Sequence, residues 1–148
     1  MKKIKIIAVG SLNPEFKKLF SHYEKSIARY YSLTVTEIKE FSEEKNIETK
    51  KFKETQLIIK SIPNNSYVVL CSLKGKSYNS IKFSNLINTY TDLTFIIGGS
   101  DGMCEAKILS NEQIIFSHMT FPHQLFRIML GEQIYRAATI LNNKKYHK

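Results

Sequence analysis

The sequence predicts an α/β fold built on a parallel sheet, and two observations point to it. Short apolar runs rich in β-branched residues alternate with longer segments in which apolar residues recur at helical spacing. The chain has 148 residues, of which 43% are hydrophobic and 24% are charged. This length and composition suit one well-packed core rather than two ordinary domains. We therefore expect a single domain over residues 1–148.

Short apolar, β-branched runs predict strands over residues 4–9, 33–38, 67–73, 93–97 and 113–117. Between the first two strands, apolar side chains from Phe16 to Tyr30 recur at helical spacing, with Lys18 and Lys25 on the opposite face. This helix is expected to begin at Pro14, because proline is favoured in a first turn.

Residues 43–60 are charged and compatible with a helix. They supply a set of basic residues, namely Lys45, Lys50, Lys51, Lys53 and Lys60. The whole chain has 22 Lys and Arg against 13 Asp and Glu, a net charge of +9, which favours a polyanionic partner. A generally lysine-rich composition explains part of this excess. A solvated helix face also explains the lysines of this segment, and we favour that interpretation.

The last helix, expected over residues 121–141, is apolar around most of its circumference. Such a helix has to be covered on more than one side, and a second subunit is one possible cover. Gly131, Tyr135 and Ala138 share a face on which another helix could approach closely. Ordinary packing against the sheet explains these three residues almost as well.

Several classes of protein are disfavoured by what the sequence lacks. The apolar run after Met1 is interrupted by Lys5 and is too short for a signal peptide, and no later stretch approaches a membrane span. Cys71 and Cys104 have no CxxC spacing, so neither a disulfide framework nor a zinc site is indicated. We expect a protein of the reducing cytoplasm, without a bound metal and without a membrane partner.

A glycine-rich turn follows the fourth strand, where Ile97 leads into Gly98, Gly99 and Gly102. Open α/β sheets bind ligands at the carboxyl ends of their strands, and glycine lets the backbone approach a ligand there. The spacing is not GxGxxG and lacks the Lys and Ser/Thr of a P-loop, so neither a nicotinamide nor an ATP site is supported. A tight connection without a ligand remains open.

The segment 116–124 places polar groups beside bulky apolar ones, as a pocket for an aromatic base requires. It leads into the last helix, on which His123 and Arg127 are four residues apart and share a face. A surface or capping role is the alternative for each histidine. The histidines have no metal-ligand pattern, and no Ser/His/Asp set is present.

Three motifs in order carry a family resemblance: FIIGGSDGM, then MTFPHQLFRIMLGEQIYRAATI, then a terminal YHK. With the opening IKIIAVGSL and residues 73–76, the chain resembles over essentially its whole length the SPOUT-class family of ribosomal RNA large-subunit methyltransferases called RlmH. The resemblance implies a C-terminal trefoil knot and a homodimer. It also implies methylation of N3 of a pseudouridine in the helix 69 loop of 23S rRNA, within the assembled ribosome, with S-adenosylmethionine as donor.

The resemblance also assigns site residues. It places the S-adenosylmethionine contacts at Cys71, Gly98, Phe116, Ser117, His118, Met119, Thr120 and Phe121. Cys71 stands where the family usually has Leu, and its small apolar side chain should preserve a wall contact.

Residues for RNA contact and alignment are His123, Arg127, Arg136, Tyr146, His147 and Lys148. We place His147, Tyr146 and Arg127 in catalysis, with His147 as the favoured general base. Glu132 offers Arg136 an i,i+4 ion pair as an alternative role. A non-enzymatic RNA-binding or ribosome-associated factor is the second hypothesis. A flavodoxin-like regulator is a third, which lacks a recognisable phosphate loop.

Overall fold

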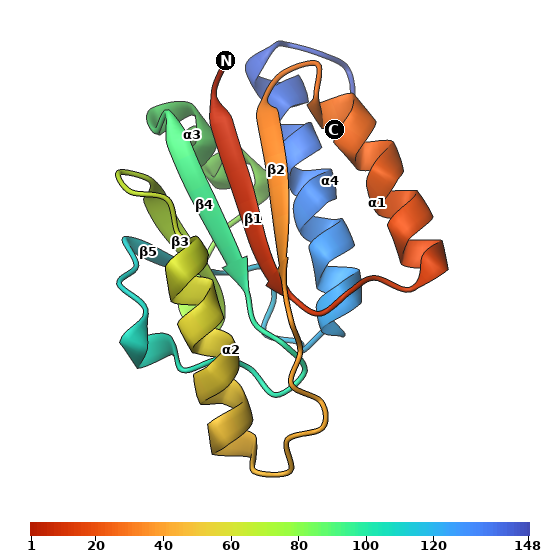
Figure 1. The fold of residues 1–148 in the computed structure, drawn as a ribbon. Coiled ribbons are helices and arrows are strands. Elements are labelled where there is room, and N and C mark those ends of the chain that lie inside the picture. The colour runs from red at the N-terminus through yellow and green to blue at the C-terminus, as the bar shows by residue number, and fades with distance from the viewer.

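The computed structural model describes residues 1–148 and contains a five-stranded sheet in which every neighbouring pair of strands is parallel. The strand order is β2-β1-β4-β3-β5 (Figure 1). The strands are β1 Lys3–Val9, β2 Ser32–Ile38, β3 Tyr67–Ser77, β4 Asp92–Ile97 and β5 Glu112–Ile115. The predicted α/β fold with a parallel sheet is confirmed.

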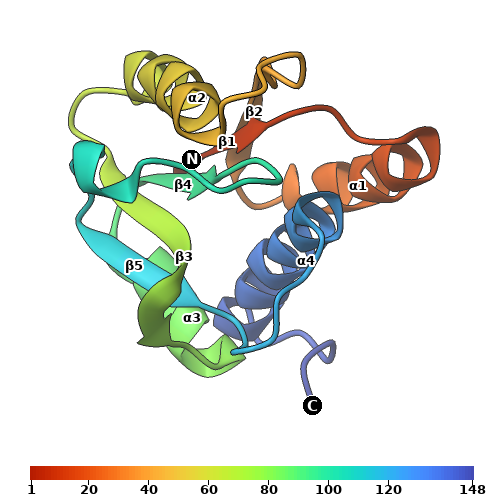
Figure 2. The same ribbon diagram turned by 90° about the horizontal axis from the view of Figure 1, so that it is seen from below.

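Helices cover both faces of the sheet, and the core is divided accordingly into two clusters. Helices α1, Pro14–Ile27, α3, Ser80–Thr89, and α4, His123–Leu141, lie on one face, and α2, Ile47–Ser61, lies on the other (Figure 2). The alternation of side chains along β1 shows the division: Ile6 packs with the three-helix side and Ile7 packs with Ile58 of α2. Burial on both faces explains why β1 and β4 are almost continuously apolar.

Strand β3 is longer than predicted, because it contacts β5 twice. Cys71 pairs with Ile114, and after an irregularity Lys76 pairs with the same residue. The crossing depends on Gly75, where an added Cβ would lie 2.5 Å from the backbone nitrogen of Ile114. The predicted end of β3 at residue 73 is therefore too early, while β5 ends at Ile115 and not at residue 117.

The sequence analysis did not predict α3. The helix is short, and its N-terminus is capped by Asn79, whose side chain accepts a hydrogen bond of 2.8 Å from the Lys82 backbone N–H. Its apolar residues Phe83, Leu86 and Ile87 are buried in the core. Helix α1 begins at Pro14 as predicted.

Helix α4 begins at His123, two residues later than expected, because Pro122 has an extended backbone and occupies the N-cap. The face with Gly131 packs against α1 of the same chain, since a Cβ at Gly131 would lie 3.0 Å from the Phe20 ring. Ordinary intrachain packing thus explains the close approach at this glycine. Leu125, Met129 and Ile140 are only partly buried, so some apolar surface of α4 stays open.

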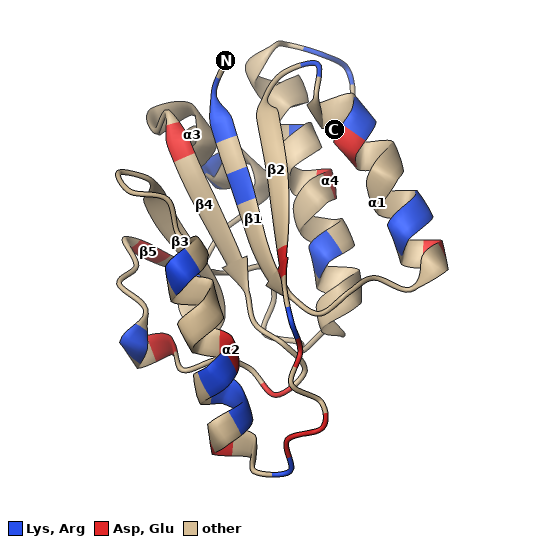
Figure 3. Cartoon of the chain, viewed as in Figure 1, with Lys and Arg blue, Asp and Glu red and all other residues tan.

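The lysines of α2 do not form one basic surface. Lys50 is only 3% exposed, and Lys51 and Lys53 pair with Glu48 and Glu44 at 3.7 Å. Figure 3 shows acidic residues among the basic ones on and beside α2. The favoured interpretation, a solvated face, holds for the paired lysines Lys51 and Lys53 but is wrong for Lys50, which is buried. None of the helices is long and apolar enough to span a membrane.

Candidate active site

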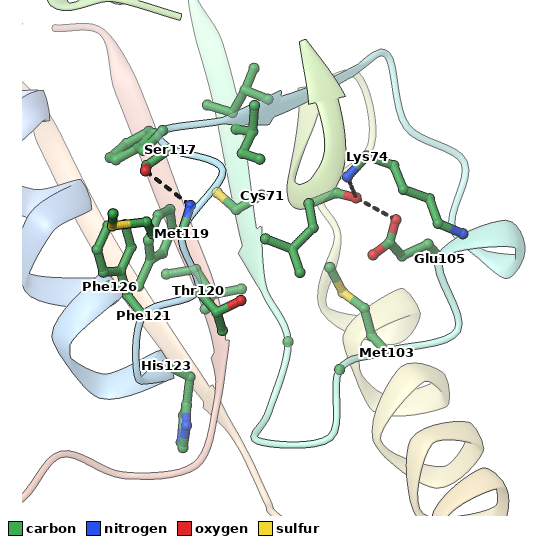
Figure 4. A pocket seen from close by; sticks show the side chains of 18 of the residues that line it. Cys71, Lys74, Met103, Glu105, Ser117, Met119, Thr120, Phe121, His123 and Phe126 are labelled. Atoms are coloured by element: carbon green, nitrogen blue, oxygen red, sulfur yellow. Dashed lines mark hydrogen bonds between the residues drawn. The ribbon is translucent and has the colours of Figure 1, made fainter. Parts of the chain in front are cut away.

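A cavity of about 320 Å³ lies at the carboxyl ends of β3, β4 and β5 (Figure 4). Parallel strands end at the same edge of a sheet, so segments far apart in sequence meet there. The cavity is lined by the end of β3, the glycine turn, the η1 turn Glu105–Lys107, the segment between β5 and α4, and the start of α4. Its lining residues are 71–74, 97–99, 102, 103, 105, 114–117, 119–121, 123 and 126.

Most residues assigned to S-adenosylmethionine by resemblance meet in this cavity. Those that line it are Cys71, Gly98, Phe116, Ser117, Met119, Thr120 and Phe121. His118 does not line the cavity and is exposed. The structure therefore brings together three segments that are separated by 18 residues or more in the sequence.

The glycine turn closes on itself beside the cavity. The Gly102 N–H donates a hydrogen bond of 3.0 Å to the Gly99 carbonyl, and Gly102 has a φ of +84°, a conformation that favours glycine. A Cβ at Gly98 would lie 3.1 Å from the Gly102 carbonyl carbon and 3.3 Å from Met103 Cγ. A side chain at position 98 would thus be tightly packed against the other limb of the turn, and backbone forms this wall.

Apolar side chains form the opposite walls. The Phe116 ring packs on Phe126 with ring centroids 4.8 Å apart and meets Phe83 edge-on at 5.9 Å. The Ser117 hydroxyl accepts a hydrogen bond of 3.1 Å from the Met119 N–H and shapes the loop (Figure 4). Burial raises the pKa of the Cys71 thiol to about 12, so this wall is uncharged at neutral pH.

Glu105 is the only carboxylate in the cavity lining, and the sequence analysis did not single it out. Its Oε1 accepts a hydrogen bond of 2.7 Å from the Ser72 hydroxyl, which in turn accepts one of 3.1 Å from the Lys74 N–H (Figure 4). A carboxylate held in this way can attract a cationic group of a ligand. No cluster of three or more His, Cys, Asp or Glu side chains is placed to hold a metal ion.

A family model described as "Predicted SPOUT methyltransferase" matches residues 1–147 of the chain. This chain belongs to the SPOUT methyltransferase family. It is 62% identical over 150 residues to "Ribosomal RNA large subunit methyltransferase H" of Mycoplasmopsis agalactiae, which covers 100% of both chains. Proteins of the same name are 52% identical in Mycoplasmopsis synoviae and 43% identical in Clostridium tetani, each covering 98% of this chain and 99% of the relative.

In this SPOUT methyltransferase, His123 lines the cavity but Arg127 does not. Arg127 is 2% exposed, and its guanidinium contacts a Glu37 carboxylate oxygen at 2.5 Å and the Gly10 carbonyl at 2.9 Å. It therefore ties α4 to β2 and to the end of β1. The prediction that Arg127 is available for RNA contact and catalysis is corrected, because its guanidinium is buried and occupied.

The C-terminal tail folds back on the second half of α4. Arg136 pairs with Glu132 at 2.7 Å, which confirms the i,i+4 pair. The Tyr146 hydroxyl donates a hydrogen bond of 2.8 Å to Glu132, and the Arg136 guanidinium lies 3.1 Å from Nδ1 of His147. Lys148 is exposed. Burial, with the Glu132 contact, raises the pKa of Tyr146 to about 12.

The chain leaves α4 at the end of the SPOUT methyltransferase fold opposite to the carboxyl ends of β1 and β4 (Figure 1). Helix α4 has 19 residues, with His123 beside the cavity and Leu141 before the tail. Tyr146 contacts Glu132, which is nine residues along α4 from His123, or about 14 Å at 1.5 Å per residue. Neither Tyr146 nor His147 lines the cavity of its own chain.

Proposed function

We propose that this single-domain chain is a cytoplasmic S-adenosylmethionine-dependent methyltransferase of ribosomal RNA. Its substrate is N3 of a pseudouridine in the helix 69 loop of 23S rRNA, within the assembled ribosome. The observation that carries the proposal is the cavity in which the glycine turn, Cys71 and the segment 116–121 meet. Membership of the SPOUT methyltransferase family and the name shared by its relatives support it. The C-terminal knot stays a prediction from the resemblance.

The cavity residues fit S-adenosylmethionine. The volume of about 320 Å³ is in the range of small-molecule sites. Phe116 and Phe121 offer apolar surface to an adenine, Gly98 offers backbone without a side chain, and Glu105 offers negative charge to a cationic ligand. When bound, S-adenosylmethionine supplies an electrophilic methyl group. The protein then has mainly to align the acceptor nitrogen and to help remove its proton.

The tail enters this chemistry through a second subunit. Since Tyr146 and His147 do not line their own cavity, we place them at the cavity of a partner, which requires a homodimer. The partly buried Leu125, Met129 and Ile140 on α4 give such an interface apolar surface. There Tyr146 stacks on a base, while His147 and Lys148 meet the negative charge of the RNA.

His147 remains our favoured general base, on one condition set by its surroundings. Arginine only donates hydrogen bonds, so Nδ1 of His147 is the acceptor in its contact with Arg136. A nitrogen occupied in this way cannot take up a proton. The Arg136 contact must therefore open when RNA binds, and Arg136, which remains paired with Glu132, can then contact phosphate through its Nη1 group. His123, at the cavity, completes the set of RNA contacts.

Calorimetry with the purified protein tests cofactor choice. We expect S-adenosylmethionine and S-adenosylhomocysteine to bind, and NAD and ATP not to bind. Gly98→Val should abolish cofactor binding, because a Cβ at position 98 would lie 3.1 Å from the Gly102 carbonyl carbon on the other limb of the turn. NAD binding without an S-adenosylmethionine signal would refute the proposal. Absence of any cofactor binding, with retained RNA binding, would support a non-enzymatic RNA-binding factor.

Methyl transfer to ribosomes tests the substrate. A domain of this size has limited surface for reading a sequence, so we expect the shape of the assembled particle to contribute. Transfer should be efficient to ribosomes that lack the modification, poor to the naked transcript, and weaker as salt increases. Equal transfer to a short free stem-loop would contradict the assembled ribosome as substrate.

A further inference from the structure

Behind the glycine turn, outside the cavity, Lys50 of α2 is buried in a cluster of polar groups. Its Nζ lies 2.9 Å from a carboxylate oxygen of Asp101, 3.2 Å from Glu40 and 3.6 Å from Glu54. The Ser100 hydroxyl is 3.4 Å from the same nitrogen. One lysine thus joins three segments of the chain: its own helix, the start of the β2–α2 connection, and the turn.

Lys50 contacts the turn at residues that do not line the cavity. Ser100 and Asp101 occupy the tip of the turn, and neither lines the cavity, whereas Gly98, Gly99 and Gly102 do. The Ser100 hydroxyl also donates a hydrogen bond of 3.1 Å to Glu40. The tip is therefore held by Lys50 and Glu40 together, from outside the site.

A second contact with α2 holds the chain just after the turn. The Cys104 N–H donates a hydrogen bond of 3.0 Å to the hydroxyl of Thr55, which is fully buried. Between these two attachments only the Gly99 carbonyl to Gly102 N–H bond stabilises the turn from within. Helix α2 thus acts as a frame for the glycine turn, with Lys50 at the tip and Thr55 at the base.

The positive charge of Lys50 makes the position of the glycine turn depend on this residue more than on Thr55. Burial by itself lowers the pKa of a lysine, but hydrogen bonds to Asp101 and Glu40 and the charge of Glu54 outweigh it and raise the Lys50 pKa. The ammonium therefore stays charged, and it faces three carboxylates. Without it, Asp101 and Glu40 would repel each other across the gap that the ammonium now fills. This repulsion acts directly on the tip of the turn.

We propose that Lys50 is a positioning residue, which holds the glycine turn in the form that lines the cofactor cavity. The inference rests on the proposed S-adenosylmethionine site. Apparent affinity falls in proportion to the fraction of molecules in the competent conformation, so a turn that is competent one tenth of the time binds about tenfold more weakly. Lys50→Met should raise the dissociation constants of S-adenosylmethionine and S-adenosylhomocysteine equally, by about tenfold. The variant should have a higher KM for S-adenosylmethionine and an unchanged kcat at saturating S-adenosylmethionine.

Lys5→Met is the matched control. Lys5 of β1 also holds α2, but at its other end, where Nζ donates a hydrogen bond of 2.6 Å to the Ser61 carbonyl. Removal of this lysine should reduce thermal stability while the cofactor dissociation constant stays at the wild-type value. Unchanged affinity in Lys50→Met, with only a stability loss like that of Lys5→Met, would overturn the proposal. A loss for S-adenosylmethionine alone would also overturn it, because Lys50 would then act through charge and not through the turn.

If Lys50→Met does not fold, substitutions of its partners Ser100 and Asp101 in the glycine turn test the positioning role instead. The Asp101 side chain is 38% exposed and Ser100 is exposed, so the double variant Ser100→Ala, Asp101→Ala leaves the core intact. It should weaken both ligands in the same way, and wild-type affinity would refute the positioning role. In Lys50→Met, adding Asp101→Ala should recover part of the lost affinity, because it removes the repulsion between Asp101 and Glu40; a further loss would contradict the proposed mechanism. If the wild type itself binds no S-adenosylmethionine, the proposed function fails instead.

Discussion

Replacement of Gly75 by alanine tests how tightly β3 and β5 cross beside the cavity. An added Cβ would lie 2.5 Å from both the backbone nitrogen and the carbonyl carbon of Ile114, and 2.7 Å from the carbonyl carbon of Gln113. Ordinary contact begins at 3.4 Å, so the strands would have to separate by about 0.9 Å. Backbone held in a sheet cannot move as the end of a flexible side chain can.

The magnitude follows from this geometry. Overpacking of a tight site costs about 1–3 kcal/mol, and each ladder hydrogen bond lost costs about 1 kcal/mol more. Strand β5 has only four residues, so little pairing remains to absorb the shift. We expect Gly75→Ala to lower the free energy of unfolding by about 3 kcal/mol or more. Cofactor binding should weaken too, since Ile114 and Phe116 line the cavity.

Urea unfolding measures the loss, with Gly102→Ala as the matched control. Gly102 has no atom within 4 Å of its added Cβ, but its φ of +84° makes alanine strained by about 1 kcal/mol. The control therefore adds the same methyl group with strain and without a clash. If Gly75→Ala is as stable as Gly102→Ala, the close crossing does not exist as described.

Three further predictions concern single features. Deletion of residues 146–148 should leave dimerisation and S-adenosylmethionine binding intact. It should reduce the rate of methyl transfer at least tenfold, a loss of about 1.4 kcal/mol of transition-state stabilisation. Full activity in the truncated dimer would show that the tail is dispensable. Glu37→Ala should destabilise the protein more than Arg127→Met. The first change leaves a buried guanidinium without its carboxylate, whereas the second leaves the Glu37 carboxylate in contact with water; thermal melts with the opposite order of stability would contradict this assignment. Since burial raises the Cys71 pKa to about 12, its thiol stays protonated at pH 8; rapid alkylation of Cys71 in the native protein, seen by mass spectrometry, would contradict the raised pKa.

Local sequence patterns predicted the strands well, for a physical reason. Strands buried on both faces are continuous runs of β-branched residues, and β1 and β4 have this character. The extension of β3 was missed because its residues 74–77 are polar and small, and only pairing with β5 makes them a strand. Helix α3 was missed although Asn79 and the spacing of Phe83, Leu86 and Ile87 offered a cap and an apolar face.

The candidate site was predictable in part. The glycine turn is visible because its residues are adjacent in sequence, and the parallel-sheet rule places it at a ligand-binding edge. The cofactor residues around it came from the family resemblance. Glu105 carried no signal, because only the η1 turn brings its carboxylate to Ser72, 33 residues away.

Sequence alone determined the fold class, the order of most elements and the place of the glycine turn, because these depend on contacts between residues close along the chain. Tertiary structure decided the roles of individual charged side chains. Lys50 and Arg127 look like surface bases in the sequence, yet both are buried. Their carboxylate partners Asp101 and Glu37 lie 51 and 90 residues away along the chain, so local sequence does not show these pairs. Burying a charge is favourable only where such a partner meets it, and only the folded chain brings the two together.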